Sequence, residues 1–178
     1  MTISQPARDE YADFHTGYIA AVAHEVDAVA ALERQQPLIE AMGRLGQQQA
    51  SHRYADGKWT VRAVIGHLTD TERVLSYRLM RIARGDHTPL PRFDEKLVAD
   101  HSNADARGVD DLAGELALVR ASTLALVKSL DDTAVARRGT VGEWSLSARA
   151  IAFIIAGHFE HHMNVLRDRY GIELKAES

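Results

Sequence analysis

Three histidines of this chain have the spacing expected of ligands to one divalent metal ion. His158 and His162 follow an HxxxH pattern, and His67 lies alone in an earlier helical segment. Because a helix turns by about 100° per residue, positions i and i+4 share one face. Both imidazoles are expected to point to the core, because the apolar residues around them fall in the same arc: Ile151, Ile154, Ile155, Val165 and Leu166.

Imidazoles buried in an apolar stripe need partners. A buried polar group without a hydrogen bond costs about 1–3 kcal/mol, and a buried charge costs more. A metal ion removes this cost, since neutral imidazole is the commonest metal ligand and suits zinc, nickel, iron and copper. Three protein ligands that leave one position for water or substrate are typical of a catalytic site. The alternative is a pair of ordinary packed or surface histidines, because HxxxH also occurs by chance.

The surroundings of His67 favour the metal interpretation. The segments 57–60 and 142–145 share a Gly-x-Trp-Thr/Ser pattern, and each is predicted to open a helix with a Gly-His pair, at His67 and at His158. Two similar helix starts thus lead to two similar histidines. Trp59 and Trp144 could line a pocket, but aromatic residues at helix starts more often staple the end of a bundle.

Composition restricts the class of protein. The 178 residues, 46% hydrophobic and 26% charged, predict one globular domain over 1–178, with about 1–16 as an N-terminal extension. A net charge of -4 gives no reason to expect nucleic acid or a membrane as a partner. Without a signal peptide or a long apolar run, the protein is expected to be cytoplasmic. Zero cysteines leave only nitrogen and oxygen ligands for a metal.

Four helical segments are predicted from the period of the apolar positions. Their bounds are about 25–45, from Thr60 to Gly85, about 109–130, and from Ser145 or Ser147 to Tyr170. With no convincing alternating strand, the pattern predicts an all-α four-helix bundle. Such bundles build metal sites in the core from facing helices.

Single residues refine these helices. Pro37 should kink the first helix, Thr60 should cap the second, and Gly171 should end the fourth. The connection between the second and third helices, 85–108, is rich in turn formers. A connection of that length is usually functional or a crossover.

Other polar residues are candidates for supporting roles. Glu72 lies in the apolar stripe of the second helix. Its carboxylate could assist a metal ligand or act as a general base. A buried ion pair with Arg120 or Arg149 is the favoured alternative. His161 could orient a ligand, but a surface or interface position is favoured. The candidates for contact with a substrate are Trp59, Arg120, Arg149 and His161. The remaining histidines are expected to be exposed: His15, His24, His52, His87 and His101.

The order of these motifs resembles the DinB family of DinB/YfiT-like metalloenzymes. The similarity extends from about residue 17 onward and is carried by 57–62, 66–73, 77–86, 88–91 and 157–162. The resemblance implies an up-up-down-down type of four-helix bundle, often a homodimer. It also implies a divalent metal, commonly nickel or zinc, held by histidines that match His67, His158 and His162.

The resemblance extends to activity. Members of the family include thiol S-transferases that use bacillithiol, mycothiol or glutathione, and a mycothiol-dependent isomerase, while others are described as hydrolases. We therefore expect a metal-dependent enzyme that acts on small molecules with an activated thiol or water as nucleophile. Thiol S-transfer in detoxification or stress, with a low-molecular-weight thiol as cosubstrate, is preferred over hydrolysis, because the resemblance implies thiol cosubstrates. The absence of cysteine also leaves no protein thiolate to compete for the metal. The alternative from another class is a stress-linked scaffold whose metal only stabilises the bundle.

Overall fold

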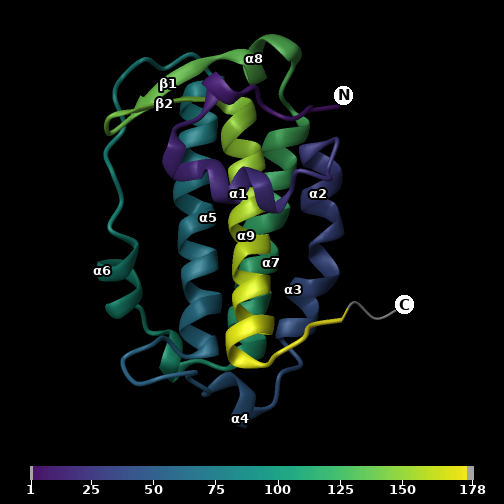
Figure 1. Ribbon diagram of the computed structural model, residues 1–178, viewed down its shortest axis with the longest axis vertical. Helices are drawn as coiled ribbons and strands as arrows, with labels where there is room; N and C mark the ends of the chain where they lie inside the picture. Colours follow the sequence, from purple (N-terminus) through teal and green to yellow (C-terminus); the bar gives the residue numbers. More distant parts are fainter. Residues whose placement is uncertain (1, 176–178) are drawn as a thin grey trace.

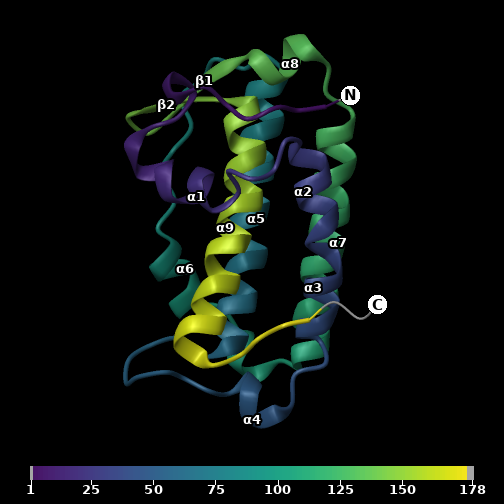
Figure 2. The ribbon, with the colours of Figure 1, turned by 45° about the vertical axis from the view of Figure 1, so that its right-hand side comes forward.

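Four long helical stretches run side by side along the longest axis of the molecule (Figures 1 and 2). The computed structural model describes residues 2–175. The stretches are α2 (Ala28–Arg34) continued by α3 (Gln36–Met42), α5 (Val61–Ala83), α7 (Val109–Lys128) and α9 (Ala148–Tyr170). The predicted four-helix bundle is confirmed. None of its described helices combines the length and apolar character needed to span a membrane.

The direction of the helices differs from the expected order. In chain order they run down, up, up and down in Figure 1. The parallel consecutive pair is therefore α5 and α7 in the middle of the chain, and the up-up-down-down order is wrong. Because α5 and α7 are parallel, the connection between them has to cross the length of the bundle, and this explains why it is long.

Local sequence signals set the ends of the helices that carry the histidines. Thr60 Oγ1 accepts a hydrogen bond of 3.0 Å from the backbone N–H of Ala63, and Ser147 Oγ accepts one of 2.9 Å from that of Ala150. Gly171 follows α9 with φ of 67°, which glycine adopts without strain. These three predicted boundaries are confirmed.

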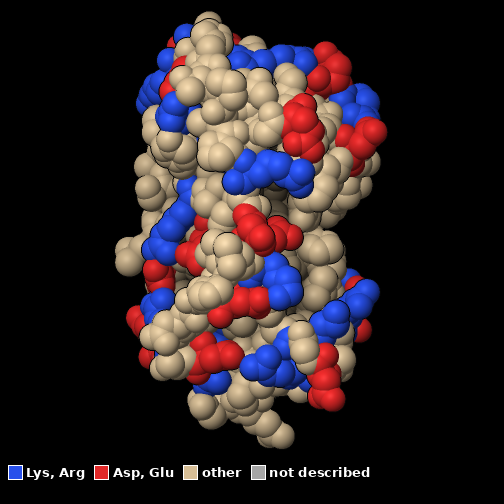
Figure 3. Space-filling view, turned by 90° about the vertical axis from the view of Figure 1, so that its left-hand side faces the viewer, with Lys and Arg blue, Asp and Glu red and all other residues tan. Residues whose placement is uncertain are grey.

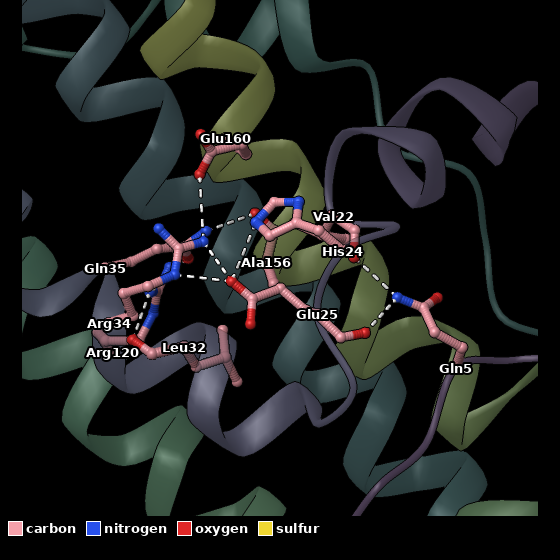
Figure 4. Close-up of polar contacts among 10 residues, drawn as sticks. All are labelled: Gln5, Val22, His24, Glu25, Leu32, Arg34, Gln35, Arg120, Ala156 and Glu160. Carbon is pink, nitrogen blue, oxygen red and sulfur yellow. Dashed lines mark hydrogen bonds and ion pairs between the residues drawn. The ribbon is translucent and has the colours of Figure 1, made fainter.

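The junction of α2 and α3 is fastened to α9. Gln35 separates the two helices, and Pro37 lies in the first turn of α3, where no backbone N–H is needed. The predicted kink is thus confirmed close to Pro37. Gln35 Nε2 donates to the carbonyl of Ala156 at 2.9 Å, and the neighbouring Arg34 lies 3.9 Å from Glu160 (Figure 4).

The segment 142–145 does not open a helix, contrary to the prediction. It forms the turn and part of the second strand of an antiparallel hairpin, β1 (Arg138–Val141) and β2 (Trp144–Ser147). Leu90 of the long connection adds a parallel bridge to Val141. These short strands are stabilised by pairing with each other and with Leu90, which is distant in sequence, and helical periodicity does not report such pairing. The similarity between 57–60 and 142–145 is therefore one of sequence and not of structure.

Short elements complete the described chain. They are the 3-10 helices η1 (Arg8–Glu10), η2 (Asp13–His15) and η3 (Ala104–Ala106), and the α-helices α1 (Thr16–Ala21), α4 (Gln47–Ala50), α6 (Glu95–Asp100) and α8 (Asp132–Ala136). The expected N-terminal extension packs on the bundle, since Ile3 is buried and Gln5 Nε2 donates to the carbonyls of Val22 and Glu25 (Figure 4). Within the long connection, α6 packs beside α5.

The apolar core consists of two clusters, one toward each end of the bundle. Leu75 and Ala156 belong to the cluster near the hairpin, and Leu68 and Phe159 belong to the other. The boundary between the clusters therefore crosses α5 and α9 at the level of the histidines. A layer of buried polar side chains lies at this level: Gln35, His67, Thr71, Glu72, Arg120 and His158.

Candidate metal centre

The three histidines singled out in the sequence converge from α5 and α9 in the polar layer. Their nearest available nitrogens lie within 4.8 Å of one another. Nε2 of His67 is 3.1 Å from Nε2 of His158, and the ring of His162 is centred 4.8 Å from that of His67 and 4.7 Å from that of His158. Nitrogens that share a tetrahedral zinc at about 2.1 Å lie roughly 3.4 Å apart. The observed cluster is close to that arrangement.

Burial keeps the three imidazoles neutral. His67 and His158 are almost inaccessible to solvent, and His162 is half-buried. Burial lowers the pKa of His67 to about 4, with a smaller contribution from His161. Burial and the neighbouring imidazoles hold the pKa values of His158 and His162 well below the usual range. Neutral imidazole is the protonation state that a metal ligand requires.

The hydrogen bonding of the cluster is incomplete. Nδ1 of His162 is buried without a partner among the described residues. Nδ1 of His67 has only a long contact, 3.4 Å, with the hydroxyl of Thr71. Two Nε2 atoms face each other at 3.1 Å, so at most one of them can donate to the other. Three neutral imidazoles with unused lone pairs fit a divalent ion such as zinc or nickel.

Aromatic rings cover the cluster on two sides. The ring of Trp59 lies 4.8 Å from that of His67, and the ring of Tyr18 in α1 lies 5.5 Å from that of His158. His161 is exposed, and its ring contacts those of Tyr18 and His162. Trp59 therefore forms part of the wall around the histidines as well as preceding α5.

Two cavities reach the histidine cluster, one at His158 and the other at His162. The first has a volume of about 580 Å³ and is lined by His158 and Thr71. The second has a volume of about 460 Å³ and is lined by His162, Trp59 and His161. The first turn of α6 borders both cavities. A small molecule therefore has room in either cavity next to the cluster.

Glu72 belongs to a separate, closed ion pair, the arrangement that the sequence favoured. Arg120 donates from Nε to Oε1 and from Nη2 to Oε2 of Glu72, each at 2.8 Å. Its Nη1 donates to Oε1 of Gln35 at 3.0 Å and to the carbonyl of Leu32 at 3.2 Å (Figure 4). Both carboxylate oxygens are thus occupied by a buried guanidinium.

Two candidates for substrate contact lie away from the two cavities. Arg120 is completely buried and lines neither of them. Arg149, near the start of α9, donates to Ser4 Oγ at 3.2 Å and approaches Glu10 at 3.9 Å. Helical periodicity does not give the level of either arginine along the bundle.

His15 is buried, contrary to the prediction that it is exposed. Its ring packs edge-on against those of Phe14 and Trp144, because η2 lies against the hairpin. Burial lowers the pKa of His15 to about 4; hydrogen bonding to the Ala12 backbone opposes this shift, and the charge of Arg78 adds to it. The other four histidines predicted to be exposed are exposed, namely His24, His52, His87 and His101.

Arg78 lies outside the histidine motifs, but its spacing from them is a signal in the sequence. Arg78 follows His67 by eleven residues and Thr71 by seven. At about 100° per residue these spacings put all three on one face of α5. Tyr18 carried no comparable signal, because its position depends on how the N-terminal segment packs. Trp144, which the sequence offered as a possible pocket residue, lines the first cavity.

Comparison with known proteins identifies the family of this fold and site. The DinB superfamily model matches residues 30–166, and the chain belongs to this superfamily. Among solved structures the chain resembles YfiT from Bacillus subtilis, described as "a probable metal-dependent hydrolase with an unusual four-helix bundle topology". The TM-score is 0.70 and the identity 23%, over 81% of this chain and 86% of YfiT. No curated protein matches the sequence. The predicted family and fold are confirmed.

Proposed function

We propose that the protein is a hydrolase of small molecules that depends on a divalent metal held by His67, His158 and His162. The observation that carries the proposal is the convergence of three neutral imidazoles with unused nitrogens beside a cavity of about 580 Å³. A divalent ion bound there lowers the pKa of a water molecule and polarises the bond to be cleaved. The description of YfiT as a probable metal-dependent hydrolase of the same fold supports this choice.

Residues around the histidines would position them and exclude water. The hydroxyl of Thr71, 3.4 Å from Nδ1 of His67, would orient that ring. Tyr18 packs edge-on against His158 and limits access of bulk water from α1. Gln35 holds the carbonyl of Ala156, two residues before His158, and so fixes the backbone of α9 beside the site.

Nickel and zinc are the ions that we propose for this ligand set. Three imidazoles and no sulfur ligand are compatible with either ion. The three ligands carry no charge that offsets that of a divalent ion. The proposed site would therefore attract an anionic nucleophile or substrate group.

Thiol S-transfer is the second candidate, and the second cavity favours it. That cavity, of about 460 Å³, reaches His162, whereas the first cavity reaches His158. A low-molecular-weight thiol and an electrophile could thus occupy separate cavities at the cluster. The chain itself holds no cysteine that would compete for the ion.

A scaffold whose metal only stabilises the bundle would not need cavities at its ligands. Two cavities adjoin them here. Figure 3 shows acidic and basic side chains interspersed on the face crossed by the long connection, with no continuous basic area there. Both observations support a small molecule as the substrate. Homodimer formation and a cytoplasmic location stay predictions from the sequence.

The test begins with protein purified without a chelating tag. Elemental analysis should find about one zinc or nickel per chain. The loaded protein should then be screened against esters, amides and lactones, and separately against electrophiles with added thiols. We expect hydrolysis that chelation abolishes and metal restores, and that is absent in His158→Ala. Activity only with added thiol would favour S-transfer, and bound metal without either activity would favour the scaffold.

A further inference from the structure

We propose that the first cavity binds a small organic carboxylate, and that Arg78 binds the carboxylate group. Arg78 lines this cavity together with apolar and aromatic side chains, while His158 borders the same space. The inference rests on the proposed function in one respect, since the reacting bond would lie at the histidines. Binding of the carboxylate to Arg78 does not itself require the metal.

The first argument is that Arg78 is a cation without an acidic partner. Three cationic side chains line the cavity, and two of them are paired: Arg92 with Glu143, and Lys96 with Asp100. Arg78 donates from Nη2 to the carbonyl of Pro91 at 2.9 Å, and no carboxylate of the described residues pairs with it. Partial burial lowers its pKa, although arginine stays charged at neutral pH. A half-buried guanidinium with free donors is suited to a planar anion.

The second argument is the apolar wall beside Arg78. The rings of Phe14 and Trp144 are stacked at 4.8 Å, and Leu75 and Ile154 contribute aliphatic surface. This wall excludes water along one side of an apolar ligand. His15 is neutral at pH 7 because burial holds its pKa at about 4, so it adds no competing charge. The ligand is therefore expected to combine a hydrophobic body with one charged end.

The third argument is the alignment of Arg78 with the histidines. Arg78 lies seven residues after Thr71 on one face of α5, which corresponds to about 10 Å along the helix axis. Thr71 contacts His67 and also lines the cavity. A ligand held by Arg78 at one end could therefore extend about 10 Å along the cavity to the level of Thr71, and His158 borders the same cavity. This length fits a small acid with a group to be cleaved several bonds from its carboxylate.

The charges at the mouth favour a single negative charge on the ligand. Asp94 and Glu95 of the segment that begins α6 also line the cavity. These carboxylates would repel a phosphate dianion more strongly than a carboxylate. A monocarboxylate is therefore the better match.

Calorimetry with 4-phenylbutanoate and the neutral 4-phenylbutanamide tests the proposal. Both probes are titrated into the full chain, once loaded with metal and once treated with chelator. We expect the chelated protein to bind the carboxylate, and Arg78→Gln to weaken this binding at least tenfold while leaving amide binding within a factor of two. Arg81→Gln is the matched control, because Arg81 lies on the same helix, pairs with Asp86 and lines neither cavity.

Other results of these titrations would overturn the proposal or separate it from the proposed function. Equal carboxylate binding by wild type and Arg78→Gln overturns the proposal, as does absence of carboxylate binding in both forms of the wild type. Binding seen only with metal, and lost in His162→Ala, would assign the carboxylate to the ion and also overturn it. Arg78-dependent binding by a protein that takes up no metal would support the carboxylate site and contradict the proposed hydrolase. Circular dichroism of each variant verifies that it is folded.

Discussion

Two groups of polar side chains lie at the same level of the bundle and differ in how fully their atoms are bonded. Between α5 and α7, Glu72 and Arg120 form a two-point ion pair that Gln35 extends to the backbone of α9. Between α5 and α9, His158 and His162 border cavities, and among the described residues the histidine cluster has one hydrogen-bond contact with another residue type, that of Thr71 with His67. We call the first group closed, because its polar atoms are paired, and the second group open, because some of its nitrogens are not.

The difference separates structure from function. A buried polar network whose atoms are all paired holds helices in register and leaves nothing for a ligand. A buried cluster with unused nitrogens pays a desolvation cost that a bound ion would remove. Residues of similar burial, a few positions apart on α5, therefore have different roles according to their partners.

The largest expected effect on stability concerns the closed group. Arg120→Met leaves the carboxylate of Glu72 buried without its partner, so we expect the free energy of unfolding to fall by about 3–5 kcal/mol. Arg73→Met is the control, because Arg73 is exposed, and its pairs with Asp70 and Glu115 are worth about 0–1 kcal/mol. Urea denaturation measures both. Equal losses in the two variants would contradict the distinction between the groups.

A smaller effect is expected where a hydroxyl supports the open group. Thr71→Val removes the contact to Nδ1 of His67, and loss of such a partner lowers metal affinity by about 10-fold or more. Thr69→Val is the matched control, since Thr69 is buried on the same helix but donates to the carbonyl of Ile65. Competition with a fluorescent chelator measures both affinities. Equal affinities in the two variants would show that Thr71 does not orient the ring.

The smallest effect concerns pH and the buried His15. Its pKa is about 4 in the folded chain and about 6.5 in an unfolded one, so between these values the unfolded state binds more protons. The stability that the chain gains from burying a neutral His15 is therefore fully present above about pH 6.5 and is lost as the pH falls toward 4. His15→Phe should therefore show a smaller drop in urea midpoint between pH 7 and pH 5 than wild type. The exposed His87→Phe should behave as wild type, and an unchanged drop in His15→Phe would contradict the burial argument.

Much of the fold could be predicted because its signals are local. The hydroxyl caps Thr60 and Ser147 and the glycine at 171 act on the adjacent turn of helix. The hairpin could not be predicted in this way, since its strands are stabilised by each other and by Leu90. The helix directions also escaped prediction, because they depend on how the long connection crosses the bundle.

The candidate site could be predicted where its signals lie within one helix or one motif, and not where they depend on packing between elements. His158 and His162 share a face by their spacing alone, and the matched motif added His67. Whether the polar atoms of a side chain find partners depends on contacts between helices. The level of Arg120 along the bundle therefore could not be predicted from periodicity within one helix. The burial of His15 depends on the hairpin, which was itself missed.

Metal stoichiometry in two neighbouring variants tests the central claim most directly. His162 belongs to the open group, and His161 is exposed next to it. Wild type and His161→Ala should each retain about one zinc or nickel per chain after dialysis, whereas His162→Ala should retain less than a tenth of that with its helical circular dichroism intact. Full retention of metal by His162→Ala, or equal loss in His161→Ala, would contradict the account.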